Sequence, residues 1–180
     1  MGYLDVFDQH YSLRTYQKEH IQELEKAFAQ GKRKPMVQSP TGSGKSLEIV
    51  YLALKALDKA AQKSTQSKIL IVCPNENLIR NLEKYFKTLK VPYGIIQGNT
   101  QTNWFAPIVI ASSATLHKRL ETIPVQFNYV ILDEAHFGKA ASWDKFIHFF
   151  WRLPYTYYAA THVIQWPVQR AANPREGALS

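Results

Sequence analysis

The fold of this chain is decided by Pro40-Thr41-Gly42-Ser43-Gly44-Lys45-Ser46, a turn that joins a short apolar segment at 36–37 to a run of helical character at 47–61. Gly42 and Gly44 allow the backbone to turn tightly, so that consecutive N–H groups can converge on one anion. The helix that follows directs the positive end of its dipole at the same point. The stretch therefore predicts a phosphate-binding turn followed by a helix.

The side chains that close this turn suit a nucleoside triphosphate with its magnesium ion. Lys45 can reach the β- and γ-phosphates, and the Ser46 hydroxyl can ligate Mg²⁺. The expected nucleotide contacts in the turn are Thr41, Gly42, Ser43, Gly44, Lys45 and Ser46. Ser39 stands where the pattern G-x-x-x-x-G-K-[ST] has its first glycine, so a turn that merely caps a helix stays open as an alternative.

Length and composition are those of one globular domain. The 180 residues, 46% of them hydrophobic, are enough for one domain with a hydrophobic core and few for two domains. We expect neither a membrane span nor a signal peptide, because no run of about 18 apolar residues and no basic region followed by an apolar one is present. Cys73 is the only cysteine, which predicts a small buried residue and a reducing compartment, the cytoplasm or, in a eukaryote, the nucleus.

The charge distribution favours a polyanionic partner. The formal net charge is +8, and residues 80–132 carry six basic side chains against two acidic ones. The basic ones are Arg80, Lys84, Lys87, Lys90, Lys118 and Arg119. Lysines at 55, 59 and 63 recur at helical spacing instead, which is typical of a solvated helix face. We therefore expect a nucleic-acid surface on the segment 80–132.

Apolar strands alternate with helical runs along most of the chain. Helices are expected at 15–29, 47–61, 76–89, 115–120 and 142–151, and strands at 36–38, 68–73, 94–97, 108–111 and 129–132. This alternation predicts an α/β fold, a three-layer sandwich with a mainly parallel sheet. In such a sheet ligands bind at the carboxyl ends of the strands, so the phosphate turn and the residues after 132 can face one site.

An acidic pair follows the last of these strands, in the run Asp133-Glu134-Ala135-His136. Asp133 can hold the Mg²⁺ that bridges the phosphates, usually through water, because Mg²⁺ dehydrates reluctantly. Glu134 can orient and deprotonate the attacking water for in-line displacement. The run therefore predicts the catalytic half of the site, with Glu134 and Lys45 as its catalytic residues.

Together these segments resemble the first RecA-like domain of a superfamily 2 helicase of the DEAH-box-like group, which includes restriction-enzyme motor subunits and excision-repair helicases. The resemblance rests on residues 13–17, 39–46, 72–78, 111–116 and 133–136, in the family's order. It implies a RecA-like P-loop NTPase with ATP and Mg²⁺ as ligands. It also places Arg14 and Gln17 in the adenine-reading segment and His136 among the nucleotide-site residues. On this assignment, Gln17→Ala is expected to relax the preference for adenine.

The resemblance further implies contacts with the phosphate backbone of a nucleic acid, with DNA favoured over RNA. The candidates are Pro74, Asn75, Arg80, Ser112, Thr115 and Lys118. Trp104 and Phe105 lie in a polar loop, where a ring can stack on a base, although core packing of at least one ring is the expected alternative. The segment 159–162 stands where the family has motif III, but Ala159 lacks the hydroxyl and His162 replaces the proline.

Motors of this group need two RecA-like domains. We expect residues 1–161 to form one such domain and residues 162–180 an irregular tail. We then expect the chain to be half of a motor: a truncated product, a fragment, or one subunit of a split machine whose second domain comes from a separate chain. The chain is then expected to bind ATP and Mg²⁺, hydrolyse ATP slowly and contact nucleic acid weakly, without unwinding a duplex. The alternative is a non-catalytic module that binds nucleic acid or a partner and holds ATP as a structural ligand.

Overall fold

The structure of this protein is a computed structural model that describes residues 2–32, 35, 37, 39, 42–133, 149 and 157–160, with 101 and 157–160 described by backbone alone. Among these residues, the sheet has six strands in the order β3-β2-β4-β1-β5-β6. The strands are β1 (Ile69–Cys73), β2 (Tyr93–Gln97), β3 (Thr100–Gln101), β4 (Ile108–Ser112), β5 (Tyr129–Leu132) and β6 (Tyr157–Ala160). Every neighbouring pair is parallel except β2 and β3, which confirms the mainly parallel sheet.

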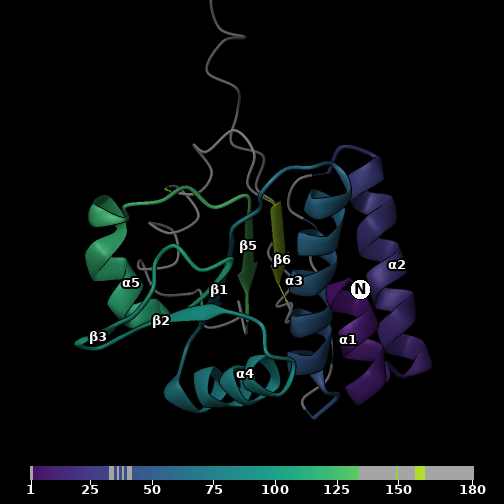
Figure 1. Cartoon of the computed structure of the whole chain (residues 1–180), viewed down its shortest axis with the longest axis horizontal. Helices are drawn as coiled ribbons and strands as arrows, with labels where there is room; N and C mark the ends of the chain where they lie inside the picture. Colours follow the sequence, from purple (N-terminus) through teal and green to yellow (C-terminus); the bar gives the residue numbers. More distant parts are fainter. Residues whose placement is uncertain are drawn as a thin grey trace, which may run out of the picture.

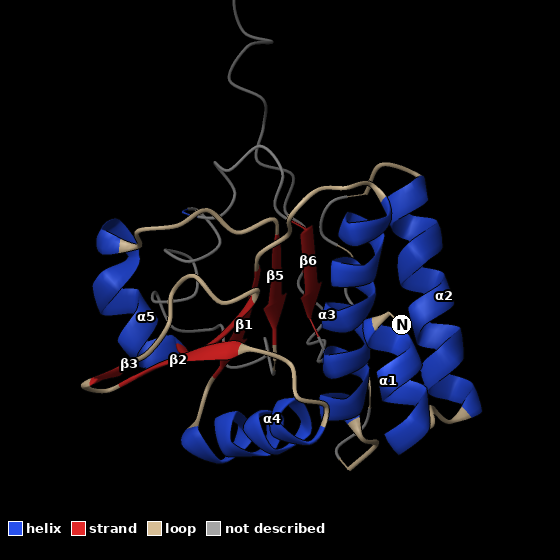
Figure 2. Ribbon diagram, viewed as in Figure 1, coloured by secondary structure: helices blue, strands red, loops and turns tan. Residues whose placement is uncertain are grey.

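The helices lie on both faces of this sheet, as a three-layer sandwich requires. The helices whose bounds the structure describes are α1 (Tyr3–His10), α2 (Thr15–Ala29), α3 (Lys45–Gln62), α4 (Glu76–Thr88) and α5 (Ser113–Arg119), which continues as a 3₁₀ turn over Leu120–Thr122. Figure 1 shows α3 beside the sheet with α1 and α2 outside it, and Figure 2 shows α5 far from that group. The core divides accordingly: α1–α4 share one apolar cluster, and α5 belongs to a second.

The alternation of side chains along β1 explains why its sequence is apolar throughout. Ile69, Ile71 and Cys73 join the cluster under α1–α4, whereas Leu70 and Val72 join the cluster under α5. All five residues are fully buried, because a central parallel strand is covered on both faces. The burial of Cys73 confirms the interpretation of that residue as part of the core.

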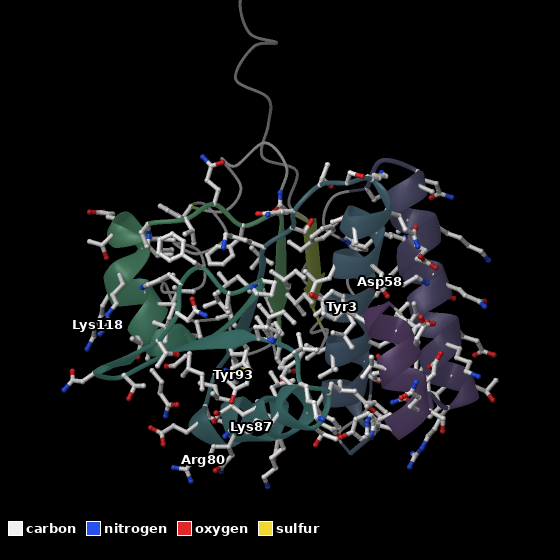
Figure 3. The ribbon with its side chains drawn as sticks, in the orientation of Figure 1. Tyr3, Asp58, Arg80, Lys87, Tyr93 and Lys118 are labelled. Atoms are coloured by element: carbon white, nitrogen blue, oxygen red, sulfur yellow. The ribbon has the colours of Figure 1, made fainter. Side chains whose placement is uncertain are left out.

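Helix α1 was not among the expected helices, and a contact distant in the sequence explains its stability. Asp58 of α3 accepts hydrogen bonds from the backbone N–H groups of Tyr3 and Leu4, both at 2.8 Å. Figure 3 shows Tyr3 and Asp58 next to each other. The helix also buries Phe7 completely. A helix of this length is marginal in isolation, so the capping of its first turn by α3 and the burial of Phe7 hold it in place.

Three other expectations concern segments at the edge of the description. Val37 is buried but belongs to none of the described strands, and residues 36 and 38 of the expected strand lie outside the described residues. Phe149 is helical, and the rest of the expected helix at 142–151 lies outside them as well. So does the expected tail at 162–180. Among the described residues, no helix combines the length and apolarity needed to cross a membrane.

Of the two aromatic residues in the loop before β4, one packs in the core, as the alternative to base stacking predicts. Trp104 is buried in the cluster under α5, whereas Phe105 is 73% exposed. The Lys68 ammonium group lies 5.6 Å from the centre of the Phe105 ring and donates a hydrogen bond to the Phe105 carbonyl. Lys68 directly precedes β1, so this contact lies at the amino ends of the strands, opposite to the edge that carries the predicted site.

Candidate functional site

The phosphate loop has the backbone conformation that its glycines predict. Gly42 and Gly44 have φ angles of +79° and +80°, in the left-handed region that favours glycine. Helix α3 begins at Lys45, and the Leu47 N–H group donates to the Gly44 carbonyl at 2.9 Å. Because α3 spans 18 residues, its aligned peptide dipoles add to a positive N-terminus at the loop. Residues 40 and 41, including the predicted contact Thr41, lie outside the described residues.

Ser39 has a role that the comparison with a glycine pattern did not suggest. It is fully buried, and its hydroxyl group lies 2.9 Å from the hydroxyl group of Ser43, within hydrogen-bonding distance. The two residues stand on either side of the turn. A serine at this position therefore bridges the base of the loop, which a glycine could not do.

Helix α2 contacts the phosphate loop from the other side. The Gln17 side-chain amide donates to the carbonyls of Ser43 and Gly44, each at 3.1 Å. The Tyr16 hydroxyl group donates a second hydrogen bond to the Ser43 carbonyl. These contacts join segments 26 and 27 residues apart in the sequence. Two carbonyls of the loop are thus satisfied by side chains of one helix.

The amide oxygen of Gln17 is also engaged. It accepts a hydrogen bond from the Arg14 backbone N–H group at 2.9 Å, which fixes the start of α2. Gln17 is only 2% exposed, while Arg14 is exposed with its guanidinium group 3.5 Å from the Tyr16 hydroxyl. The structure thus brings Gln17 to the phosphate loop and Arg14 to the Tyr16 hydroxyl. The reading of adenine by these two residues stays a prediction.

A buried carboxylate lies one turn into α3. Glu48 is 2% exposed, and both of its carboxylate oxygens lie 3.4 Å from Nδ1 of His20 on α2. Burial raises the pKa of the Glu48 carboxyl group, and the nearby His20 and Lys45 only partly offset this effect. The pair adds a polar contact between α2 and the first turn of α3, next to the side chain predicted to bind phosphate.

The described part of the acidic run lies where the sequence predicted. Asp133 directly follows β5, is 2% exposed, and donates its backbone N–H to the Val72 carbonyl of β1 at 2.9 Å. It therefore lies at the carboxyl edge of the sheet. Helix α3 leads through a short loop to the amino end of β1, so the helix runs back along the sheet and its N-terminus lies toward the same edge. Glu134 and His136 lie outside the described residues.

The candidate nucleic-acid residues gather at two helix starts. Asn75 caps α4, where its side chain accepts from the Leu78 N–H at 3.1 Å, and Ser112 caps α5 in the same manner at 3.4 Å from the Thr115 nitrogen. Strands β1 and β4 pair in parallel with Cys73 opposite Ser112. The two capping residues and Pro74 therefore lie at the same edge as Asp133.

The charged candidates lie further along these helices. Arg80 and Lys118 are both exposed, and Figure 3 shows them at the periphery on α4 and α5. Arg80 lies 3.6 Å from Glu76, one turn earlier on its own helix. The Thr115 hydroxyl accepts from the Gly98 N–H at 2.8 Å, and Arg119 donates to the Gly98 carbonyl at 2.8 Å. Thr115 therefore also holds the β2–β3 turn against α5.

Four residues at this site were not identified from the sequence as functional candidates. Tyr16 and His20 lie on the same helical face as Gln17, a spacing that marks a shared contact surface. Ser39 and Glu48 flank the phosphate loop, but nothing in their spacing indicates the partners that the fold brings to them. All four residues have polar side-chain atoms, and the structure leaves each of them half-buried or buried.

Comparison with known proteins gives a family and several relatives. The family described as "Type III restriction enzyme, res subunit" matches residues 10–161. The "51.5 kDa protein" of Lactococcus phage (isolate 7-9) is 28% identical over 126 residues, which cover 70% of this chain and 24% of that protein. The chain thus spans about a quarter of the length of that relative.

Three solved structures share the fold. The Hef helicase domain of Pyrococcus furiosus matches with a TM-score of 0.60 and 19% identity, covering 81% of this chain and 33% of that one. The SWI2/SNF2 ATPase core of Sulfolobus solfataricus, solved in complex with dsDNA, matches with a TM-score of 0.65 and 17% identity. This match covers 86% of this chain and 32% of that one. The UvsW helicase of bacteriophage T4 matches with a TM-score of 0.63 and 20% identity, covering 83% of this chain and 52% of that one. These likenesses establish the helicase RecA-like α/β fold.

Proposed function

Because this chain belongs to the family of Type III restriction enzyme res subunits, we propose that it is the ATP-binding and Mg²⁺-dependent ATP-hydrolysing domain of a superfamily 2 helicase motor. The observation that carries this proposal is the phosphate loop. Two glycines with positive φ lead into an 18-residue helix, and the carbonyls of Ser43 and Gly44 point back toward α2. That arrangement leaves the opposite side of the loop to N–H groups, which suit a phosphate chain.

The residues present also suit a magnesium ion. Mg²⁺ prefers oxygen ligands and is usually held by one or two protein groups together with phosphate oxygens and water. Ser46, in the first turn of α3, and Asp133, directly after β5, would supply a hydroxyl and a carboxylate. When bound, the ion would neutralise charge on the β- and γ-phosphates.

The other residues then divide the chemistry. Lys45 binds the β- and γ-phosphates and stabilises the charge that develops on them. Glu134 accepts a proton from the water that attacks the γ-phosphorus, while the bond from that phosphorus to the β-phosphate oxygen breaks and ADP leaves. Thr41 and His136 complete the set of nucleotide-site residues. We assign Arg14 and Gln17 to the same site, on the α2 side of the loop.

The proposed partner is a nucleic acid, with DNA favoured over RNA. A relative of the same fold was solved in complex with dsDNA. In this chain the candidates Pro74, Asn75 and Ser112 directly follow or end strands β1 and β4 at their carboxyl ends. Contacts from caps and exposed cations reach the phosphate backbone and carry no sequence information. A second RecA-like domain, in the same protein or in a separate chain, would supply an arginine across the cleft and raise the rate of hydrolysis by roughly 10³–10⁵.

Turnover of ATP with and without single-stranded DNA tests this proposal. We expect slow wild-type hydrolysis that DNA accelerates, and loss of at least about 99% of it in Glu134→Gln, because a general base contributes roughly 10²–10⁴ in rate. Glu121→Gln is the matched control, since Glu121 is an exposed carboxylate in the 3₁₀ turn after α5.

Each outcome decides between the two functions under consideration. Turnover that survives Glu134→Gln would remove this glutamate from its assigned role. ATP binding by calorimetry without turnover in any condition would favour the non-catalytic module that holds ATP as a structural ligand. Equal loss in Glu121→Gln would show that the assay reports folding instead of catalysis.

A further inference from the structure

Among the residues that the structure describes, Phe105 is the one large apolar residue that is exposed. It lies three residues before Ile108, the first residue of β4, and therefore at the amino edge of the sheet, where the parallel strands begin. The proposed nucleotide site lies at the opposite edge and does not use this residue. The preceding Trp104 is buried in the core, so the loop is anchored and the exposure belongs to the Phe105 side chain alone.

The loop that carries this ring is held closely against β2. The Thr102 N–H donates to the Ile95 carbonyl at 2.9 Å, and the Ile95 N–H donates to the Thr102 hydroxyl at 2.8 Å. A Cβ atom added at Gly94 would lie 2.2 Å from the Asn103 carbonyl oxygen, so the loop packs directly on the backbone of the strand. A ring presented on such a support costs little ordering entropy when a ligand binds to it.

A cation lies next to the exposed ring. The Lys68 ammonium group is 5.6 Å from the centre of the Phe105 ring and donates to the Phe105 carbonyl at 2.7 Å. The backbone of Lys68 is fixed in turn, because its N–H donates to the Asn128 side chain at 2.8 Å. An ammonium group has three donors, and the carbonyl takes one of them. The others suit an anion that lies beside the ring.

A second lysine lies on the other side of the ring along the same edge. Strand β4 lies between β2 and β1, and Ile108 pairs with both Tyr93 and Ile69. Lys90 is exposed three residues before Tyr93, and Lys68 directly precedes Ile69. Neighbouring strands lie about 4.8 Å apart, so the two lysines flank the loop of the ring. The other charged residues in the loops before β1, β2, β4 and β5, at 63 and 121, are one lysine and one glutamate, which leaves a local excess of positive charge.

This pattern suits an unpaired nucleic-acid strand better than a protein. The core of a protein interface needs several apolar side chains that are buried together, whereas a single exposed ring lies here between two cations. One ring is enough to stack on one base, and every base has a face for stacking. In a duplex the bases are already stacked on each other, so the ring can reach only an unpaired base.

We propose that Lys68, Phe105 and Lys90, defined here as the amino-edge patch, bind single-stranded nucleic acid. An unpaired base stacks on the Phe105 ring, and the two ammonium groups contact phosphates on either side of that base. The patch is separate from the nucleic-acid candidates Asn75 and Ser112, which lie at the carboxyl edge. It goes beyond the proposed function, because it adds a second contact surface at the opposite end of the strands.

Two oligonucleotides separate stacking from charge. The full chain is titrated with oligothymidylate of about twelve nucleotides, a length within the site sizes of single-strand binding proteins, and with an abasic strand of the same length. Phe105→Ala should lower the affinity for oligothymidylate by about tenfold, which is within the range for one base stacked on an aromatic ring. It should leave the affinity for the abasic strand unchanged, because that strand has no base to stack.

The lysine variant should give a different pattern. Lys90→Gln should lower both affinities by about threefold and reduce the slope of log affinity against log salt by about 0.7, the value for one phosphate contact on a single strand. Gln126→Ala is the matched control, because Gln126 is an exposed uncharged residue in the loop before β5. It should change neither affinity.

Conservative variants test whether the ring itself is required. Phe105→Tyr keeps an aromatic face and should retain the wild-type affinity for oligothymidylate. Phe105→Leu keeps an apolar side chain without that face and should bind as weakly as Phe105→Ala. If Phe105→Leu bound like wild type, plain apolar contact would be sufficient, which would overturn the stacking proposal. Circular dichroism checks that each variant is folded.

The remaining outcomes also decide the question. Unchanged affinity for oligothymidylate in Phe105→Ala would overturn the proposal and leave the ring to a protein partner. An equal fall for both strands would show that the ring shapes the edge without stacking, which overturns it as well. ATP affinity, measured in the same variants, should stay at the wild-type value. Absence of ATP binding by the wild-type chain would contradict the proposed nucleotide site and leave the amino-edge patch untouched, so the two failures are distinguishable.

Discussion

The loop corner and the α4–α5 edge are built in opposite ways. The loop corner is defined as residues 39 and 42–48 with the first turns of α2. It is held by polar contacts, all but the Ser39–Ser43 one between residues distant in the sequence, and Gln17, Ser39 and Glu48 are almost completely buried. The α4–α5 edge, defined as residues 74–80 and 112–118, carries its charges on exposed side chains. Arg80, the charged candidate of α4, contacts Glu76 on its own helix.

Under the proposed function, this difference corresponds to two modes of recognition. Buried hydrogen bonds are expensive to break, because the partner left behind loses its solvation as well, so the loop corner fixes the positions of its backbone groups. An exposed ion pair contributes little to stability and yields easily to solvent or to a new partner. The loop corner therefore suits one ligand shape, whereas the α4–α5 edge suits a flexible polyanion of any sequence.

The largest expected effect tests whether the loop corner binds the phosphate chain at all. Lys45→Ala should lower ATP affinity by at least about 100-fold, because it removes a charge-assisted contact worth up to about 3 kcal/mol. The fold should survive, since Lys45 is the first residue of α3 and not part of the core. Calorimetry gives the affinity, and circular dichroism checks the fold. Wild-type affinity in this variant would contradict the site.

A second substitution tests whether the loop corner tolerates a side chain at Gly44. Gly44→Ala should lower the free energy of unfolding by about 1–2 kcal/mol, because an alanine at φ +80° adopts the left-handed conformation at that cost. It should also weaken ATP binding, since the new Cβ presses on Gln17. Gly31→Ala is the control for the conformational cost, because Gly31 has a φ of +79° and open space around it. Equal ATP affinity in the two variants would argue against the tight fit at Gly44.

The α4–α5 edge is tested with a smaller effect. Arg80→Ala and Lys118→Ala should each weaken binding to single-stranded DNA by roughly fivefold and lower the slope of log affinity against log salt by about one. Neither should alter ATP affinity. Lys63→Ala, at an exposed lysine at the other end of α3, should change neither quantity. A loss in Lys63→Ala equal to the other two would show that net charge, not this edge, binds the DNA.

The smallest effect concerns the buried carboxylate of the loop corner. Because burial raises the pKa of Glu48, the folded state holds a proton more tightly than the unfolded state does. The contribution of the Glu48 carboxyl group to the free energy of unfolding is therefore complete below a pH of about 4.3, the ordinary pKa of glutamate. It declines as the pH rises through the raised pKa of the folded state. Glu48→Gln should remove this decline, so urea unfolding from pH 4 to 7 should show the variant gaining stability relative to wild type as pH rises.

Much of the fold could be predicted, because long stretches with regularly spaced or continuous apolar residues identify helices and strands. Helix α2 and strand β5 have the predicted bounds, and the ends of α3, α4, β1, β2 and β4 differ from prediction by one or two residues. Helix α1 and strand β6 were missed for a shared reason. Each is short, and each depends on a distant partner: α1 on Asp58 and β6 on pairing with β5.

The candidate site divides along the same line. The positions of Gly42, Gly44 and Asp133 followed from local rules about turns and strand ends, and the structure places them accordingly. The partners of Tyr16, Gln17, Ser39 and Glu48 did not follow, because each of these contacts except the one between Ser39 and Ser43 spans 26 residues or more. The α2–α3 pairs among them depend on tertiary packing, in which Ile21 and Leu24 of α2 share one core cluster with α3.

The amino-acid sequence was sufficient for the α/β alternation, the phosphate loop and the acidic run after β5, because backbone conformation and apolar periodicity are local properties. It was not sufficient to show which side of the loop meets α2. That choice came from packing, which set Gln17 and Tyr16 behind Ser43 and Gly44. The direction of two carbonyl groups, and with it the face offered to a phosphate, is a property of the assembled fold.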